Sequence, residues 1–307
     1  MRSLERILRF TVKAILNAKS DSDAKPSDSE IDKVLREWRE SAFYWQKHAD
    51  TIRTMFVPVT EALIEDAQII EGENVLDVAG GAGEPSLTIA ETVGPSGSVT
   101  YTDAAPEMVA AARAKAQGRG LTNLTFEQCS AQSLQFESRS FDAVICRLGA
   151  MFFPDPLAAF REMLRVTKPA GAVSLAVWCK SELNPFSHLI TNVVARYCEV
   201  QAEADPNAPG AFRFAEAGGL ARILAEAGAV DIKERVLKFN IAVPISVEQF
   251  WEMRSELSGT LREKLATLSP SQLDLLAKEA KQAVSEFFSN SGMSIPAQMI
   301  IVTGRKR

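Results

Sequence analysis

One stretch, residues 74–90, constrains the fold of this chain more than any other. It reads Asn-Val-Leu-Asp-Val-Ala-Gly-Gly-Ala-Gly-Glu-Pro-Ser-Leu-Thr-Ile-Ala. The apolar run before the glycines predicts a short buried strand, and Pro85 followed by an apolar 3.6-residue rhythm predicts the start of a helix. Gly80, Gly81 and Gly83 let the backbone approach a ligand closely, and the N-terminal end of the helix favours a negative group. We therefore interpret the stretch as a nucleotide-binding turn.

The spacing of the glycines indicates which class of nucleotide the turn would bind. A dinucleotide fingerprint that began at Gly81 would need a third glycine at position 86, where the chain has Ser86. The stretch instead resembles motif I of class I S-adenosylmethionine-dependent methyltransferases, in which an acid ends the first strand and alternating glycines follow. Asp77, Gly81 and Gly83 match this pattern. Ala79 replaces one glycine, and the Ala-Gly-Gly after the acid is similar to the ubiquinone/menaquinone-biosynthesis C-methyltransferases.

Length, composition and charge narrow the class of protein. With 307 residues, 46% hydrophobic and 24% charged, the chain can bury a proper core, which excludes global disorder and a fibrous class. A net charge of -5 argues against a nucleic-acid partner, because such partners normally demand a basic surface. The substrate is therefore expected to be a small molecule.

The cysteines and the apolar runs indicate the compartment. The four cysteines lack C-x-x-C spacing and have no histidine nearby in sequence, so we expect free thiols and no metal site. No run of 18 apolar residues exists, and no apolar signal core with a small-residue cleavage site precedes the domain. We expect no transmembrane segment and a cytoplasmic protein.

The N-terminal part divides into two segments. Residues 1–30 are a basic amphipathic segment and a linker, which suits weak docking on an anionic membrane surface or a lid, and equally a flexible or core-docked helix. Residues 31–71 predict a cap of two helices with an aromatic stripe. In many small-molecule methyltransferases such helices close over cofactor and substrate, so the resemblance makes Tyr44 and His48 candidates to line the pocket and to act in catalysis. The alternative is a stripe that only packs on the catalytic domain.

An acidic residue follows the glycines at a sequence spacing that suits ribose binding. Asp103 ends the predicted strand 98–102 and lies 20 residues beyond Gly83. An acid at this position accepts hydrogen bonds from both ribose hydroxyls of an adenosine cofactor. The alternative role for Asp103 is the N-cap of a helix that begins near Pro106. We favour ribose binding, with Ala104 beside it.

The next two strand ends complete the predicted cofactor site. After the strand 124–128, the resembled family often reads Asp-Ala-Glu, with the acid or an amide in contact with adenine. This chain has Ser130, Ala131 and Gln132 there, so Ser130 replaces the acid. After the strand 140–146, Arg147 and Leu148 leave the carboxyl end of the strand, where ligands of doubly wound sheets bind. The resulting set of predicted cofactor-binding residues is Asp77, Ala79, Gly80, Gly81, Gly83, Asp103, Ala104, Ser130, Ala131, Arg147 and Leu148.

The remaining chain predicts the rest of a class I methyltransferase domain, residues 72–307. A Lys-Pro-Ala-Gly breaker precedes a strand at 173–178, and His188 follows on the active edge. A helical insertion at about 247–288, with two helices at about 247–268 and 271–288, separates strands 230–243 and 297–303. His188 is a third candidate base, although a lone histidine is more often a packing residue. The insertion lies near the substrate or forms a dimer surface, so a homo-oligomer is one expectation.

Together these patterns predict an α/β fold: a Rossmann-like, seven-stranded, mostly parallel sheet with helices on both faces. The resemblance implies S-adenosylmethionine as cofactor and methyl transfer by in-line displacement to a small-molecule acceptor, for which a quinone-like or aromatic molecule is one candidate. Two alternatives stay open. One is a domain that binds the same cofactor without catalysis. The other is an NAD-dependent oxidoreductase, which Ser86 disfavours.

Overall fold

A single twisted sheet forms the centre of the computed structural model, which describes residues 28–198 and 207–307. The predicted basic segment and the linker up to residue 27 lie outside the described residues. In spatial order the main strands are β3 (Leu124–Gln128), β2 (Ser98–Asp103), β1 (Asn74–Val78), β4 (Phe141–Arg147), β5 (Thr167–Trp178), β8 (Gly292–Arg305) and β6 (Val230–Val243). Strands β3 to β5 are parallel, and β8 runs antiparallel to both of its neighbours. The predicted seven-stranded, mostly parallel sheet is confirmed, with a two-residue strand β7 (Phe288–Ser289) added beside β8.

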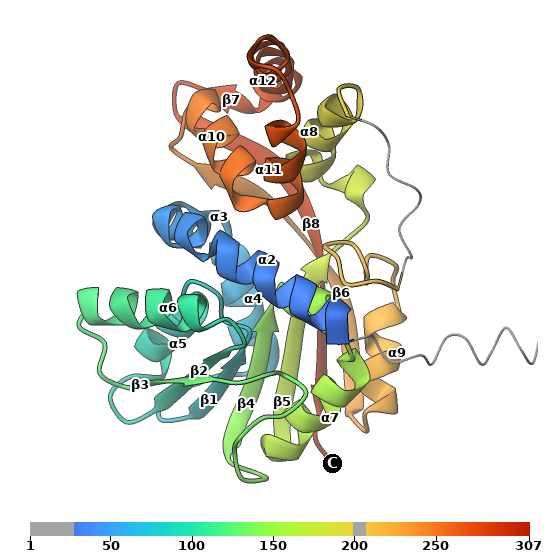
Figure 1. Ribbon diagram of the computed structural model, residues 1–307. Coiled ribbons are helices and arrows are strands. Elements are labelled where there is room, and N and C mark those ends of the chain that lie inside the picture. The colour runs from blue at the N-terminus through green and yellow to red at the C-terminus, as the bar shows by residue number, and fades with distance from the viewer. Residues whose placement is uncertain (1–27, 199–206) are drawn as a thin grey trace, which may run out of the picture.

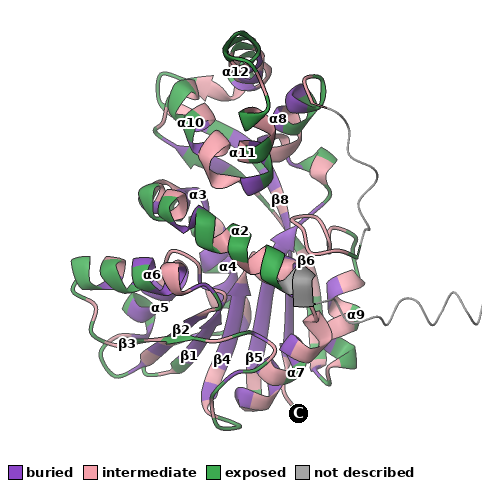
Figure 2. Cartoon of the chain, in the orientation of Figure 1, coloured by how far each residue is buried: buried purple, intermediate pink, exposed green. Residues whose placement is uncertain are grey.

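Helices cover both faces of this sheet, as predicted (Figure 1). Those that precede or connect β1, β2 and β3 lie on one face: α4 (Val57–Ala67), α5 (Ser86–Val93) and α6 (Pro106–Gly118). On the other face lie α7 (Pro156–Val166) and α9 (Gly219–Glu226). This division follows from right-handed crossovers, because strand order reverses between β1 and β4. The central strands are almost wholly buried between the two layers (Figure 2).

The N-terminal cap has three helices rather than the predicted two. They are α2 (Asp28–Lys47), α3 (Ala49–Met55) and α4. The interruption that the prediction missed lies at His48, which caps α3 without a side-chain hydrogen bond. The start of α4 is easier to explain, because Pro58 lies in its first turn and lacks the amide that a continuing helix needs.

Strand β5 begins earlier than predicted, so the breaker assigned to Lys168-Pro169-Ala170-Gly171 is wrong. These residues belong to β5, which starts directly after α7. Ala170 adopts a left-handed φ of 62°, and the pairing with β4 shifts its register between Phe141 and Ala143. A bulge of this kind accommodates an extra residue without ending the strand.

The C-terminal insertion is the largest addition to the sheet. After β6, whose bounds match the prediction, come α10 (Val247–Leu257), α11 (Gly259–Ala266) and α12 (Pro270–Val284), where the sequence predicted two helices. The Ser258 side chain accepts a hydrogen bond from the Leu261 amide and so starts α11 as a separate helix. In Figure 1 these helices lie above the carboxyl ends of the strands, beside α2 and α8 (Pro185–Ala195).

Two further observations bear on the earlier expectations. All four cysteines are free thiols; Cys146 and Cys179 are buried, and the other two are partly buried. None of the helices within the described ranges combines the length and the apolarity that crossing a membrane requires.

Candidate active site

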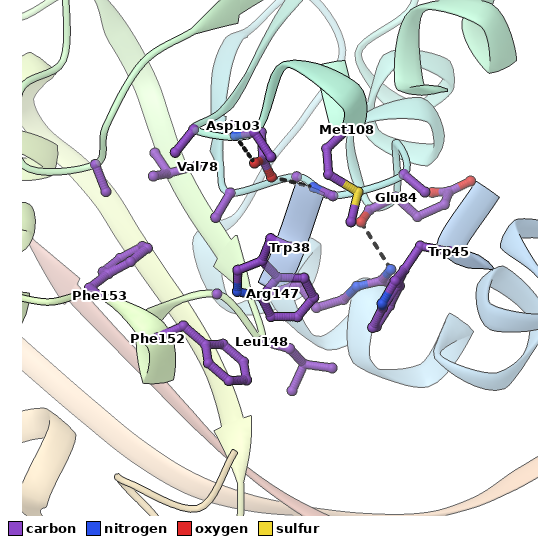
Figure 3. A pocket seen from close by; sticks show the side chains of 18 of the residues that line it. Trp38, Trp45, Val78, Glu84, Asp103, Met108, Arg147, Leu148, Phe152 and Phe153 are labelled. Carbon is purple, nitrogen blue, oxygen red and sulfur yellow. Dashed lines mark hydrogen bonds between the residues drawn. The ribbon is translucent and has the colours of Figure 1, made fainter. Parts of the chain in front are cut away.

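A cavity of about 670 Å³ lies at the carboxyl ends of β1 to β4, under helices α2 and α3. This volume falls in the range of small-molecule pockets. Its walls contain nine of the eleven predicted cofactor residues; Asp77 and Gly83 are the exceptions. Figure 3 shows Asp103 and Met108 on one side of the cavity and Phe152 and Phe153 on another.

The glycine turn has the conformation that its sequence predicts. Gly81 and Gly83 adopt positive φ angles of 55° and 117°. Gly80 has no room for a side chain, because a Cβ there would lie 2.5 Å from the Tyr101 ring and 2.8 Å from Asp77 Oδ2. A Cβ on Gly81 would meet no protein atom within 4 Å, so the space beside it is open. Ala79 occupies the replaced glycine position with a left-handed φ of 59°, which explains why a glycine suits it.

Asp77 lies below the glycine turn and does not line the cavity. Its Oδ2 accepts hydrogen bonds from the Ser86 amide at 3.2 Å and the Ser86 hydroxyl at 2.6 Å. The carboxyl group is fully buried and Oδ1 has no hydrogen-bond partner. Desolvation raises the pKa of Asp77 to about 7, despite the bonds from Ser86. Sequence reasoning treated Ser86 only as a missing glycine, whereas the structure makes it the partner of the motif acid.

Asp103 lies at the end of β2 and faces the cavity. Its two carboxylate oxygens accept hydrogen bonds from the amides of Gly81 at 3.0 Å and Ala105 at 2.9 Å. Burial raises the pKa of Asp103 to about 6. Tyr101, on the same strand, donates its hydroxyl to the Gly81 carbonyl at 2.5 Å. Strand β2 therefore fixes both the acid and the glycine turn that it contacts.

The predicted residues after β3 also reach the cavity. Ser130, Ala131 and Gln132 line it together with Cys129. The Ser130 hydroxyl donates to the Gln132 side-chain oxygen, so these two replacements of the family's acidic positions bond to each other. The arrangement leaves no carboxylate at this strand end of the cavity.

Arg147 projects from the end of β4 toward the glycine turn. Its guanidinium donates to Thr60 Oγ1 and to the Glu84 carbonyl, both at 2.9 Å, and no described carboxylate lies within ion-pair distance of it. Burial lowers the pKa of Arg147. Leu148 next to it has a left-handed φ of 64°, so two non-glycine residues, Ala79 and Leu148, hold unusual conformations at neighbouring strand ends.

Aromatic side chains cover the other half of the cavity. Trp38 on α2 lies edge-on to Phe152 at 4.9 Å between ring centroids and 5.7 Å from Trp45. Phe56, from the α3–α4 junction, also lines the cavity. Two exposed ion pairs tie the covering helices to α6: Arg39–Glu107 at 3.1 Å and Lys115–Asp50 at 2.7 Å. The sequence shows the aromatic stripe but does not indicate which of its side chains face the cavity.

The three candidate bases are not brought to the cavity. His48 Nε2 lies 2.6 Å from Glu256 Oε2, and His188 Nδ1 lies 3.0 Å from the Ser181 carbonyl. The Tyr44 ring lies under the Arg262 guanidinium, 4.9 Å from its centroid. Each therefore contacts another part of the described chain, and none is among the residues that line the cavity.

Residues 75–171 match the family model of a methyltransferase domain. An uncharacterised protein of Mycobacterium tuberculosis (strain ATCC 25618 / H37Rv) is 34% identical over 154 residues, which cover 50% of this chain and 54% of that protein. The ubiquinone/menaquinone biosynthesis C-methyltransferase of Bdellovibrio bacteriovorus is 43% identical over 102 residues, or 33% of this chain and 43% of the enzyme. The chain thus spans about half the length of the curated relatives it matches.

A solved structure supports the fold. Phosphoethanolamine N-methyltransferase 2 of Haemonchus contortus, in complex with phosphomonomethylethanolamine and S-adenosylhomocysteine, superposes with a TM-score of 0.53. The match covers 89% of this chain and 60% of that one at 17% identity. At this identity the likeness concerns the fold alone.

Proposed function

We propose that this chain, which carries the domain of class I S-adenosylmethionine-dependent methyltransferases, transfers the methyl group of S-adenosylmethionine to a small-molecule acceptor. The observation that supports the proposal most directly is that Asp103, Ala79, Gly80 and Gly81 line one cavity at the carboxyl ends of β1 and β2. A glycine turn and an acid on adjacent strand ends suit the methionine and ribose parts of this cofactor.

The residues of the site fit S-adenosylmethionine in three respects. The Asp103 carboxylate, already oriented by two backbone amides, has further lone pairs for ribose hydroxyls. The open space beside Gly81 admits a close backbone contact. The Arg147 guanidinium uses two of its five donors on neutral oxygens, so it can pair with the carboxylate of the methionine part.

When bound, S-adenosylmethionine supplies an activated methyl group on a positive sulfonium. The chain must then hold the acceptor atom in line with that carbon and exclude water, and positioning of this kind supplies much of the rate. Helices α2 and α3 provide the cover, and Trp38, Trp45 and Phe152 provide flat apolar walls. These walls favour an acceptor with an aromatic or quinone-like ring.

A general base is not needed for every acceptor. Roles for His188, Tyr44 or His48 stay predictions, and the contacts of these residues lie outside the cavity. If replacement of each by phenylalanine or alanine leaves turnover unchanged, the reaction proceeds without them. A cytoplasmic location and a homo-oligomer likewise stay predictions.

Calorimetric titration tests the proposal. The wild-type protein is expected to bind S-adenosylmethionine and S-adenosylhomocysteine but not NADH, and Asp103→Ala should weaken adenosyl binding by roughly 100-fold, because hydrogen bonds to a charged group are worth about 1.5–3 kcal/mol each. Asp155→Ala is the matched control, since Asp155 also lines the cavity but caps helix α7 through the Ala158 amide.

Three outcomes of the titration, combined with a turnover assay on quinols and phenols, are informative. Binding of NADH alone, or of none of these ligands, contradicts the proposal. Tight adenosyl binding without turnover on any quinol or phenol acceptor favours the alternative of a non-catalytic binding domain. Equal losses for Asp103→Ala and Asp155→Ala contradict the role of Asp103 in ribose binding.

A further inference from the structure

Arg53 lies on the side of helix α3 that faces the cavity. Ala49, Ile52, Arg53 and Phe56 follow one another at the i, i+3, i+4, i+7 spacing of a single helix face, and all four line the cavity. The three apolar residues are buried, whereas Arg53 is exposed. A cation that solvent can reach therefore stands in the stripe that α3 turns toward the space for ligands.

Two ion pairs place this part of α3 beside the glycine turn. Lys115 and Arg119, four residues apart at the end of α6, pair with Asp50 at 2.7 Å and with Glu84 at 2.8 Å. Residues four apart are neighbours on a helix surface, so Asp50 of α3 and Glu84 of the turn lie close together. Arg53 follows Asp50 by one helical turn. Asp50, Arg53, Glu84 and Lys115 all line the cavity, and we call these four residues the charged rim.

The charged rim lies at the end of the cavity away from the ribose position. Asp103 precedes α6, and Lys115 lies nine residues beyond Pro106, where α6 begins, which corresponds to about 14 Å along the helix. Arg147 is at the rim end, because its guanidinium donates to the Glu84 carbonyl (Figure 3) and lies 5.8 Å from the centre of the Phe56 ring. Arg53 and Arg147 therefore flank the same ring, one from the cover and one from the sheet.

Arg53 differs from the other charged residues of the cavity in having no partner. Among the described residues that line the cavity, the others with a charge are Asp50, Glu84, Asp103, Lys115, Arg147 and Asp155. Each of these has a hydrogen bond or an ion pair. The Arg53 side chain has neither with any described residue. The acids of the rim are neutralised by Lys115 and Arg119, so one positive charge is left and the rim attracts an anion.

The chemistry of arginine indicates which anion suits the rim. The planar fork of donors on a guanidinium pairs with a carboxylate through two parallel hydrogen bonds. The methionine part of S-adenosylmethionine ends in such a carboxylate. Because a carboxylate offers about four lone-pair sites, a contact from Arg147 on the sheet side leaves sites for a second arginine on the cover side.

We propose that Arg53 binds the carboxylate of the methionine part of S-adenosylmethionine. Helix α3 of the cover then contacts the cofactor directly, in addition to closing over it. The inference rests on the proposed function only for the identity of the cofactor and needs no particular acceptor. An acid group on the acceptor has the same chemistry, and the test separates the two sources.

The test compares S-adenosylhomocysteine with its decarboxylated form, which keeps the ammonium group and lacks only the carboxylate. Both are titrated calorimetrically into the full-length protein. We expect Arg53→Met to weaken binding of S-adenosylhomocysteine by about tenfold. The decarboxylated ligand should bind the variant as tightly as the wild type or slightly more tightly, because two like charges no longer repel each other. The loss should shrink as salt is added, because Arg53 is exposed.

Two further variants separate the contact from general effects of charge. Arg36→Met is the matched control, because it removes the same charge from an exposed position on α2 that does not line the cavity. It should change both affinities by less than about twofold. Arg53→Lys keeps the charge without the fork, so its loss for S-adenosylhomocysteine should lie between those of Arg36→Met and Arg53→Met.

Thermal melting shows whether Arg53→Met acts through folding. Without ligand, its Tm should stay within about 2 °C of the wild type, because an exposed side chain without partners contributes little to stability. S-adenosylhomocysteine should raise the Tm of the wild type more than that of Arg53→Met. Equal increases in Tm contradict the proposal.

The outcomes distinguish this inference from its premise. Equal losses of affinity for both ligands, or no loss for either, overturn the role of Arg53 and leave the cofactor assignment intact. If Arg53→Met instead weakens binding of benzoate in the presence of S-adenosylhomocysteine, the carboxylate belongs to the acceptor and the proposal is equally overturned. If the wild type binds neither adenosyl ligand, the proposed function fails together with the inference.

Discussion

The two halves of the cavity are built by different means. In the half formed by the strand ends, backbone amides and carbonyls determine the shape: Gly81 and Ala105 orient Asp103, and Tyr101 holds the Gly81 carbonyl. In the half formed by the helices, aromatic side chains such as Trp38 and Phe152 determine it, with few hydrogen bonds. In the strand-end half, the backbone geometry excludes most side chains at each position. In the helix half, the shape depends on which aromatic rings pack against one another. Substitutions should therefore have unequal effects in the two halves.

The largest expected effect comes from Gly80→Ala. The new methyl group would lie 2.5 Å from the Tyr101 ring, which is buried and cannot retreat. We expect the free energy of unfolding to fall by about 3 kcal/mol and adenosyl binding to be lost. Denaturant melts and calorimetry measure the two effects.

Gly118→Ala is the control for this substitution, because a Cβ at Gly118 meets nothing within 4 Å and the residue ends a helix. It should be neutral or slightly stabilising. If the two variants behave alike, the backbone half is less constrained than its geometry indicates, and the comparison between the halves fails.

An intermediate effect depends on pH and concerns Asp77. Its pKa rises from 3.8 to about 7 on burial, so the folded protein holds the proton more tightly than the unfolded chain. The folded state therefore loses stability as pH rises from about 4 to 7, because Asp77 must then ionise without solvent. Asp77→Asn should remove this loss and stabilise the protein by up to about 4 kcal/mol at pH 8, with little difference at pH 4.

Melts of Asp77→Asn and wild type across this pH range measure the difference directly. A constant difference at all pH values would show that the side chain acts through its hydrogen bonds to Ser86 alone. A difference in the free energy of unfolding that grows with pH supports the comparison, because it shows that burial of the ionised Asp77 destabilises the strand-end half of the cavity.

The smallest expected effect comes from the contacts that tie the cover to the body. Lys115→Met removes the ion pair with Asp50, whose side chain is 77% exposed. Exposed ion pairs contribute little to stability, so we expect the free energy of unfolding to change by about 0.5 kcal/mol or less. The affinity for S-adenosylhomocysteine should change less than about threefold. A large loss of affinity would show that the cover half governs cofactor retention and would reverse the comparison.

The same contrast explains what the sequence could predict. Strand β3 and strand β6 matched their predicted bounds, and Asp103 reached the cavity, because glycine spacing and strand ends impose backbone positions. The three candidate bases, Tyr44, His48 and His188, do not line the cavity. The local sequence does not determine where a side chain on a helix such as α8 points after the helix has packed. The number of helices in the cap and in the insertion was also missed.

Some structural roles had a readable signal that was interpreted differently. Ser86 was read as the absence of a glycine, yet a hydroxyl nine residues after a buried acid can bond to it across the turn. The aromatic rings facing the ligand and those in the core share one sequence pattern, so only three-dimensional packing separates them.

The insertion has one further consequence for how such a protein can change. Helices α10 to α12 leave β6 and return to β8, and these two strands pair over nearly their whole length, from Val243–Met293 back to Val230–Arg305. The helices are thus the loop of a long hairpin whose stem closes without them. Because Phe250, Met253 and Leu276 of the insertion are buried in the main core, a different loop exchanged at Val243 and Met293 would have to refill those positions. Libraries made at that junction with these three residues kept would show how far the surface of the insertion can vary while the sheet still folds.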